Sequence, residues 1–381
     1  MGDGKSSDLE RSRVVQGLRC IGSPAAASRS SHGSRDWHGP CTAGKAMDDG
    51  TDAWWRRVGS HEEGFVYLGV DGSPLRTEDA LRRIDCLAIP PAWTEVRIAP
   101  DVERKVQAYG YDRAGRKQYI YSAEHVASRE RRKWGRVLRY ARVVPRMREA
   151  TNEHLRQEGL GRERVLATVV RLMSRAFFRV GSERYAVRNR TFGICTLRKS
   201  HLEIRGNDLI FTYSGKRRID QRRVVADTPL VEILDELLAL PGGRLFRYVD
   251  GGGRVKNVTA EMVNRYIRDL LGGRYTSKDL RTFGGTVRAA TILADLGPAS
   301  SGREAKRNVV LCCRLVAMEL GNTPAICRSA YVHPSVLERY MTEGRTIDHL
   351  LQQEPRAVTA QAPVHYYPEE AALIHFLERY G

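Results

Sequence analysis

The sequence predicts an α+β protein with two parts: a small β-rich amino-terminal domain and a larger, mainly α-helical domain that carries a small β-meander. Two observations predict this division. Residues 65–121 contain short apolar runs separated by turn signals such as Asp71-Gly72 and Asp112-Arg113-Ala114-Gly115, a pattern typical of strands. From residue 129 onward, apolar residues recur at helical spacing over long stretches.

The amino-terminal part combines strands with one short helix. The expected strands are Phe65–Val70, which runs into a hairpin turn at Asp71-Gly72, Val96–Ile98, Lys105–Tyr109 and Lys117–Tyr121. A helix is expected from Thr77 to Leu87, because Pro90-Pro91 prevents it from continuing. Residues before about 50 are rich in Ser and Gly and poor in aromatic residues, which predicts a disordered extension without a secretory signal.

The remainder is expected to be mostly helical. A basic helical stretch covers residues 129–159 with a break at Pro145, and an apolar face over Arg162–Phe178 predicts a buried helix. A β-meander includes strands at Leu202–Ile204 and Leu209–Tyr213. Further helices are expected at Pro229–Leu240, Thr259–Leu271, Lys278–Leu296 and Arg303–Leu320, with a short one after Thr323-Pro324.

These elements divide the 381 residues into four segments. We expect a disordered extension at residues 1–50, a β-rich amino-terminal domain at 51–127, a mainly helical domain at 128–352 and a tail at 353–381. Within the tail, Pro368–Tyr380 has the pattern of a short amphipathic helix.

Composition limits the kinds of function. Lys and Arg number 63 against 45 Asp and Glu, a net charge of +18, which favours a polyanionic partner and nucleic acid first. Composition alone leaves open a basic protein without such a partner. No apolar run is long enough for a membrane span. The seven cysteines lack CxxC spacing, so we expect a cytoplasmic protein with Cys312 and Cys313 as reduced core residues.

Four segments carry polar residues that each have an ordinary structural explanation. Arg179 follows an apolar helix, and Lys216 lies at the tip of the β-meander, where a lysine commonly protects a sheet edge. Lys278 and Arg281 open a helix and lie one turn apart on the same face. Asn322 follows a helix as a C-cap would, and Tyr331 lies nine residues beyond it.

The order of these segments is far more specific than any one of them. The order along the chain is an Arg, a hairpin Lys, K-x-x-R, G-N-T-P and then a Tyr. This order resembles that of the type IB DNA topoisomerases, in particular their poxvirus-like and bacterial branch. The resemblance runs from about Arg83 to Tyr340. It includes the segments Leu87–Trp93, Gly115–Tyr119, Thr191–Leu197 and Lys199-Ser200-His201.

The resemblance implies a monomer that closes as a clamp around duplex DNA and relaxes supercoils without ATP, metal or cofactor. Tyr331 would attack a phosphodiester and form a 3′-phosphotyrosyl link. Arg179 and Arg281 would bind the non-bridging oxygens, where Arg offers a permanent charge and a planar fork. Lys216 would protonate the departing 5′-oxygen, with Lys278 in support.

One catalytic position departs from the family pattern. Asn322 stands where many members have His, and an amide can donate a neutral hydrogen bond to a phosphate oxygen but cannot carry charge. The resemblance also implies DNA contacts by side chains of the amino-terminal strand and of the segment after Arg179. These are Gln118, Tyr119, Tyr121, Arg184 and Tyr185.

Two other functions share part of this pattern. A tyrosine recombinase would use the same chemistry, but recombinases typically have H-x-x-R where this chain has Lys278-x-x-Arg281, and a helical rather than β-rich amino-terminal domain. A DNA-binding protein without activity could keep the fold. All five catalytic positions are filled, which favours the enzyme.

Overall fold

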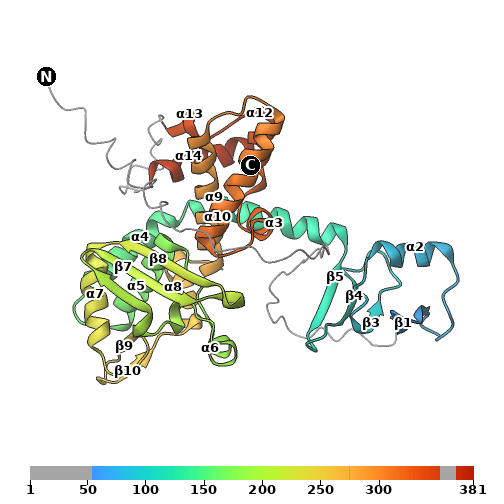
Figure 1. Ribbon diagram of the computed structural model, residues 1–381, viewed down its shortest axis with the longest axis horizontal. Helices are drawn as coiled ribbons and strands as arrows, with labels where there is room; N and C mark the ends of the chain where they lie inside the picture. Colours follow the sequence, from blue (N-terminus) through green and yellow to red (C-terminus); the bar gives the residue numbers. More distant parts are fainter. Residues whose placement is uncertain (1–53, 274, 352–365) are drawn as a thin grey trace, which may run out of the picture. The chain divides into compact units, whose positions relative to one another are not determined.

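The computed structural model describes residues 54–273, 275–351 and 366–381. A small antiparallel sheet near the amino terminus and a larger, mostly helical part confirm the predicted α+β class (Figure 1). The predicted disordered extension at residues 1–50 lies outside the described residues, as do residues 352–365 of the predicted tail. The domain limits at residues 127 and 352 stay a prediction.

The amino-terminal sheet has five antiparallel strands in the order β2-β1-β3-β4-β5. Its strands are β1 (Trp55–Ser60), β2 (Gly64–Leu68), β3 (Thr94–Ile98), β4 (Val106–Tyr111) and β5 (Lys117–Tyr121). Helix α2 (Glu78–Cys86) contributes Ile84 to a small core with Val96, Ile98 and Ala108. The two core residues of β3 are alternate positions of that strand, as the strand period requires.

The expected hairpin after β2 forms differently. Strand β2 ends at Leu68, and the turn at Asp71-Gly72 returns the chain only to an isolated bridge between Leu68 and Pro74. The long partner of β2 is instead β1, which precedes it and which the sequence pattern did not reveal. Pro74 has no N–H to donate, so a continuous ladder cannot form there.

The segment Pro90–Trp93 has a structural role in this small domain. The guanidinium of buried Arg57 donates to the carbonyls of Pro90 and Trp93, at 3.2 Å and 2.6 Å. The Trp93 side chain packs against the small core. These bonds satisfy carbonyls that a proline-rich turn cannot pair in a ladder.

The larger part is built from helices around one extensive core. Its helices are α3 (Ala123–Ala141), α4 (Val144–Leu155), α5 (Arg162–Ala176), α6 (Glu183–Asn189), α7 (Thr228–Ala239), α8 (Ala260–Leu271), α9 (Ser277–Leu296), α10 (Gly302–Leu320), α11 (Pro324–Ala330), α12 (Pro334–Glu343), α13 (Asp348–Leu351) and α14 (Pro368–Tyr380). Helices α5 and α9 contribute many of the buried residues. The amphipathic helix predicted at Pro368–Tyr380 is present as α14, and its apolar residues join this core.

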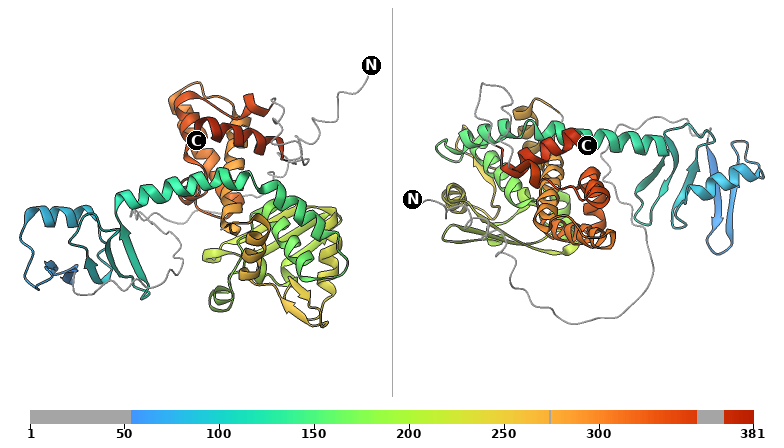
Figure 2. Two further views of the ribbon diagram at one scale, coloured as in Figure 1. Left: turned by 180° about the vertical axis from the view of Figure 1, so that it is seen from behind. Right: turned by 90° about the horizontal axis from the view of Figure 1, so that it is seen from above.

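A three-stranded sheet completes the larger part. Its strands, in the order β6-β7-β8, are β6 (Leu202–Arg205), β7 (Asp208–Ser214) and β8 (Asp220–Ala226). The sheet lies against α5, with α7 beside it, and the short ribbon of β9 (Arg247–Val249) and β10 (Val255–Asn257) lies next to it (Figure 1). Helix α3 runs across α9 and α14 in both views of Figure 2.

Three helix limits show how local signals act. Helix α3 begins at Ala123 rather than near Arg129, because Ser122 caps it by accepting from the backbone N–H of His125 at 3.2 Å. Helix α9 begins with a capping box between Thr276 and Asp279. Helix α10 ends at Gly321, which adopts a φ of 62°.

Candidate active site

Arg179 lies in the loop after α5. Phe177 ends that helix in the left-handed conformation with a φ of 52°, which turns the chain toward the site. The carbonyl of Arg179 accepts from the N–H of Ile194 at 2.8 Å. Gly193 packs against Gly181 so tightly that a Cβ at Gly193 would lie 2.5 Å from the Gly181 Cα. The Thr191–Leu197 segment therefore fixes the backbone that carries Arg179.

Arg281 enters the same site from the first turns of α9 and is only 4% exposed. Its Nη2 donates to the Leu320 carbonyl at 2.8 Å, and its Nη1 donates to the Phe177 carbonyl. Gly284, one turn further along α9, leaves room for the Phe177 ring, which a Cβ at that position would overlap. Close packing of α9 against the end of α5 thus holds this guanidinium.

Asn322 meets Arg179 immediately after α10. The Nη2 of Arg179 donates to the Asn322 Oδ1 at 2.5 Å and to the Gly321 carbonyl at 2.6 Å. The Nδ2 of Asn322 is buried and has no acceptor among the described residues. A buried donor without a partner is costly, so this amide is suited to an oxygen of a bound ligand.

Tyr331 follows α11 and lies beside Arg281. Its ring centroid is 5.4 Å from the Arg281 Cζ. Its backbone is fixed at both ends, because its N–H donates to the Cys327 carbonyl at 3.0 Å and its own carbonyl accepts from the Thr286 hydroxyl at 3.2 Å. A Cβ at Gly285 would lie 3.0 Å from the Tyr331 carbonyl oxygen, so the residue of α9 at this point must be small.

Lys216 lies at the turn between β7 and β8, as predicted. Its side chain is exposed, but partial desolvation lowers its pKa, and the nearby positive charges of Arg179 and Arg217 lower it further. Tyr331 raises the pKa of Lys216, so the lysine amine and the tyrosine side chain lie close enough to interact electrostatically. A lysine that releases its proton more easily is a better general acid.

Arg281 remains cationic at neutral pH although it is buried, and Arg179 beside it is partly buried. Burial lowers the pKa of Arg281 to about 10, with further lowering by Arg179 and a raising effect from Tyr331. Burial likewise lowers the pKa of Arg179. Two adjacent guanidiniums in a desolvated site create a strong preference for an anion between them.

Lys278 differs from the two site arginines because its side chain is exposed. It lies one turn before Arg281 on α9, as predicted, but its side chain is at the surface whereas Arg281 is buried. Burial lowers the pKa of Lys133 on α3, and the positive charge of Lys278 makes a smaller contribution in the same direction. Lys133 in turn donates to the Ser329 carbonyl at 2.8 Å, two residues before Tyr331.

His333 supports the other side of Tyr331. It is 6% exposed, and its ring lies edge-on to Trp134 at a centroid distance of 5.2 Å. Burial, with a smaller contribution from the positive charge of Lys133, lowers the pKa of His333 to about 4. The ring is therefore neutral in the folded protein at neutral pH.

This burial predicts a pH-dependent stability. Between about pH 6.5 and pH 4 the unfolded chain binds a proton at His333 that the folded protein does not, so stability falls as the pH falls through that range and is unaffected above it. We expect wild type to lose roughly 3 kcal/mol more than His333→Asn across this range in urea unfolding. The exposed His349→Asn serves as the control. Equal pH dependence of wild type and His333→Asn would contradict the assignment.

The outer face of β5 carries aromatic and basic side chains. Tyr119 and Tyr121 stack with centroids 6.0 Å apart, and the Lys117 Nζ lies 3.9 Å from the Tyr109 ring on the neighbouring strand. Ile120, between the tyrosines, packs on the small core, so the tyrosines face outward rather than into the domain.

Gln118 lies apart from these tyrosines. It alternates with them along β5, and its amide donates to the Asp112 carboxylate of its own hairpin at 2.9 Å. The same carboxylate shapes the predicted turn by accepting from the N–H groups of Ala114 and Arg116. The Gln118 amide is thus engaged within the hairpin.

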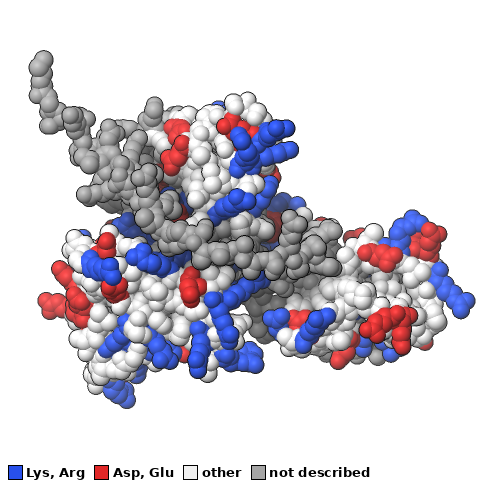
Figure 3. Space-filling model, in the orientation of Figure 1, with Lys and Arg blue, Asp and Glu red and all other residues white. Residues whose placement is uncertain are grey.

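Arg184 and Tyr185 lie on the short helix α6, which has no buried residue. Both side chains are exposed, Tyr185 by 58%. Figure 3 shows Lys and Arg side chains gathered on the viewed face around α6 and the β7–β8 turn. The exposed arginines of α6, its C-cap and the β7–β8 turn are Arg184, Arg188, Arg190, Arg217 and Arg218.

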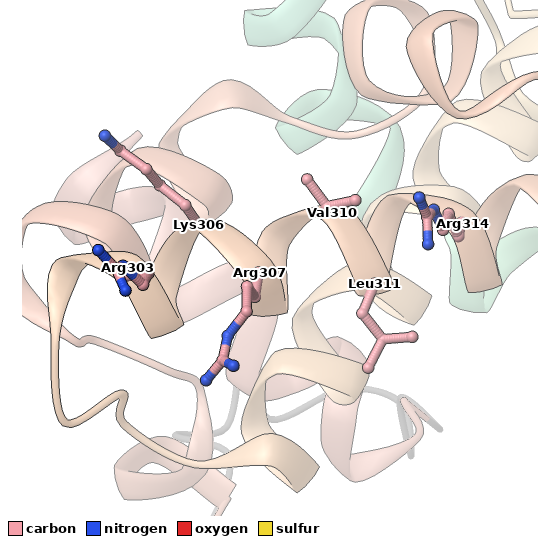
Figure 4. Close-up of a pocket in the computed structure, with 6 residues that line it drawn as sticks. All are labelled: Arg303, Lys306, Arg307, Val310, Leu311 and Arg314. Atoms are coloured by element: carbon pink, nitrogen blue, oxygen red, sulfur yellow. The ribbon is translucent and has the colours of Figure 1, made fainter.

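A second basic surface was not predicted from the sequence. One face of α10 lines an open hollow with four cationic and two apolar side chains (Figure 4), namely Arg303, Lys306, Arg307, Arg314, Val310 and Leu311. None of the four cations forms an ion pair with a described residue. The opposite face of α10 is buried and includes Cys312 and Cys313, which are free thiols as predicted. The helical spacing of these basic residues in the sequence could have revealed this surface.

Two further properties of the described residues bear on function. No cluster of three or more His, Cys, Asp or Glu side chains suitable for a metal ion occurs among them. Within the same residues, no single helix is long and apolar enough to cross a membrane, although α10 and α11 together reach that length and composition across a bend of 93°.

Comparisons with known proteins identify the family of this chain. The family described as "Eukaryotic DNA topoisomerase I, catalytic core" matches residues 121–357, and "Bacterial DNA topoisomerase IB, N-terminal domain" matches residues 64–112. "DNA topoisomerase 1B" of Acanthamoeba polyphaga mimivirus is 29% identical over 283 residues, covering 72% of this chain and 84% of the viral protein. "DNA topoisomerase 1B" of vaccinia virus is 26% identical over 238 residues, covering 60% and 70%.

The catalytic-core match spans more than half of the chain and contains all five candidate catalytic residues. The separate match of the amino-terminal part is to the bacterial form of the family. The chain therefore belongs to the type IB DNA topoisomerases, which are isomerases, with an amino-terminal domain of the bacterial kind.

Proposed function

We propose that this topoisomerase relaxes supercoiled duplex DNA by cutting one strand transiently through Tyr331. The observation that carries the proposal is the convergence of one buried and one partly buried arginine, an amide with an unpaired donor and a hairpin lysine on one tyrosine. Each of these groups suits one step of phosphoryl transfer.

In the proposed cleavage, the Tyr331 hydroxyl loses its proton to solvent water and its oxygen attacks the phosphorus. A 3′-phosphotyrosyl bond forms as the bond to the 5′-oxygen breaks, and Lys216 gives that oxygen a proton. Arg179 and Arg281 stabilise the negative charge on the non-bridging oxygens, where it is greatest in the transition state. The Asn322 Nδ2 donates a neutral hydrogen bond to one of them.

Religation reverses these steps. The 5′-hydroxyl attacks the phosphorus and returns its proton to Lys216, the bond to the Tyr331 oxygen breaks, and that oxygen takes a proton back from water. One phosphate ester replaces another in each direction, so the reaction needs no ATP. The two arginines supply the positive charge that a metal ion supplies in other phosphoryl-transfer sites, so we propose that it is also metal-independent.

We further propose that a monomer closes around the duplex as a clamp, in the cytoplasm and associated with the nucleoid. Tyr119, Tyr121, Arg184 and Tyr185 are proposed to contact the DNA, and the exposure of their elements supports this. Gln118 and Lys278 remain in the proposal as secondary contacts.

Lys216→Ala tests the general acid. We expect cleavage to slow by about 10²- to 10⁴-fold. A substrate with sulfur at the 5′-bridging position should restore most of the rate, because a thiolate leaves without a proton. Arg281→Ala is the matched control, since a better leaving group does not replace charge at the non-bridging oxygens. An unrescued Lys216→Ala would assign the proton transfer elsewhere.

We propose that the four cations on the exposed face of α10 also contact DNA phosphates, which predicts a salt effect. Removal of one phosphate-binding cation should reduce the slope of log affinity against log salt by about 0.9. We therefore expect Arg303→Ala/Lys306→Ala/Arg307→Ala to flatten the slope by about 2.7 in duplex-binding titrations. A triple variant of exposed arginines that already pair with glutamates, Arg82→Ala/Arg205→Ala/Arg265→Ala, matches the change in charge. Equal slopes for the two variants would contradict specific contacts at α10.

The proposal as a whole is tested by relaxation of supercoiled plasmid. Purified wild type is expected to relax both negatively and positively supercoiled DNA in EDTA without any nucleotide. A requirement for Mg²⁺ or ATP would overturn the metal- and ATP-independent mechanism. No relaxation under any condition would overturn the proposed activity.

A further inference from the structure

The carboxyl end of α10 is held by three arginines from three different elements. The last carbonyls of a helix have no partner within it and carry the negative end of its dipole. Here three consecutive carbonyls each accept from a different guanidinium. Arg223 of β8 donates to Glu319, Arg281 of α9 to Leu320, and Arg179 to Gly321.

Two of these arginines already have roles in the proposed reaction, and Arg223 does not. Its Nη1 reaches the Glu319 carbonyl, while the Glu319 carboxylate is occupied by Arg288 at 2.7 Å. Its Nη2 donates to the Gln221 Oε1 at 2.7 Å. Arg223 therefore joins the backbone of α10 to the strand that leaves the Lys216 turn.

The end of α10 contacts β8 so closely that only a glycine fits at position 321. Gly321 adopts a φ of 62°, and a Cβ at this position would overlap the Gln221 Oε1. The Gln221–Arg223 pair thus packs directly on the turn that precedes Asn322. Any movement of this turn would shift the Asn322 amide together with the carbonyls that orient Arg179 and Arg281.

We infer that Arg223 is a positioning residue for the cleavage and religation transition state: by fixing the end of α10 against β8, it sets the places of Arg179, Arg281 and Asn322. This inference rests on the proposed function. It assigns Arg223 to the oxyanion side of the reaction rather than to the proton transfer by Lys216.

The test uses single-turnover kinetics on a duplex with a cleavage site first mapped with wild type, at saturating enzyme. Arg223→Ala is expected to slow cleavage and religation by the same factor, between about 10 and 100, because small misplacements of catalytic groups have effects of this size. The cleavage equilibrium and the Kd for DNA should stay within about threefold of wild type. A 5′-bridging sulfur should not restore the rate.

Two variants separate positioning from general destabilisation. Arg222→Ala changes the neighbouring, exposed arginine on the other face of β8 and should stay within about threefold of wild type. Arg223→Lys keeps the charge with a single donor group and should recover part of the rate. If Arg223→Ala does not fold, the cleavage rate of Arg223→Lys still tests the inference. Rates are compared well below each variant's Tm.

Three outcomes would overturn the inference: wild-type rates for Arg223→Ala and Arg223→Lys, rescue by sulfur, or an effect confined to DNA affinity. Rescue would assign Arg223 to the support of Lys216. Absence of any adduct with wild type would instead count against the proposed function, and it would be seen before the variants are compared.

Discussion

Tyr331→Phe is expected to remove all detectable relaxation and all covalent adduct, the largest effect of any single substitution in this protein. The change deletes only the hydroxyl that would bond to phosphorus. The ring contact with Arg281 and the backbone bonds to Cys327 and Thr286 remain in the variant, and only the hydrogen bond between the Arg281 side chain and the hydroxyl is lost. DNA affinity should therefore stay within about threefold, as measured by titration with a labelled duplex.

A matched control is available on the same part of the chain. Tyr340 lies nine residues further on and is buried, with its hydroxyl donating to the Gly297 carbonyl at 2.8 Å. The same hydroxyl accepts from the Asn308 amide at 2.7 Å, so Tyr340→Phe should lower stability by about 1–3 kcal/mol and keep the adduct. Adduct formation by Tyr331→Phe would show that another side chain is the nucleophile.

Arg281→Ala is expected to have the second largest effect, slowing single-turnover cleavage by about 10³-fold or more. Removal of one preorganised donor at a developing oxyanion commonly costs about 10²- to 10³-fold, and this donor is also charged and desolvated. Arg281→Lys should remain strongly impaired, because one ammonium cannot reproduce the planar fork that reaches both Phe177 and Leu320.

The same substitution has a structural cost that must be measured separately. Two carbonyls are left without the guanidinium that they accept from, which should lower the free energy of unfolding by about 1–3 kcal/mol. Thr282→Ser is the mild control on the same helix, because it removes one buried methyl group and keeps the hydroxyl that donates to the Lys278 carbonyl. A cleavage rate for Arg281→Ala within about tenfold of wild type would contradict its role at the phosphate.

The catalytic candidates could be recognised in the sequence because their order along the chain resembles that of a known family, and each stands at a helix end or a turn that the sequence predicts. Arg179 follows the apolar stretch of α5, Lys216 lies in a hairpin, and Asn322 follows the glycine that ends α10. These signals are local: a run of apolar spacing, a glycine with positive φ, a capping threonine. The limits of α9 and α14 were predictable for the same reason.

Contacts between distant parts of the chain were not predictable. The close approach of Gly193 to Gly181 and the bond from Arg223 to Glu319 leave no pattern in either segment alone. Strand β8 was hard to recognise because it begins with four polar residues. Strand β1 was missed because it contains adjacent arginines, of which Arg57 is buried by bonds to distant carbonyls.

The most direct test of the central claim is the chemical identity of the trapped adduct. Wild type is denatured with detergent during reaction on a duplex labelled on the 5′ side of the cleavage site, digested with protease and sequenced by mass spectrometry. We predict a peptide containing Tyr331 joined to the 3′-phosphate of the labelled strand, with a free 5′-hydroxyl on the other fragment. A link to another residue, or to a 5′-phosphate, would contradict the proposed mechanism.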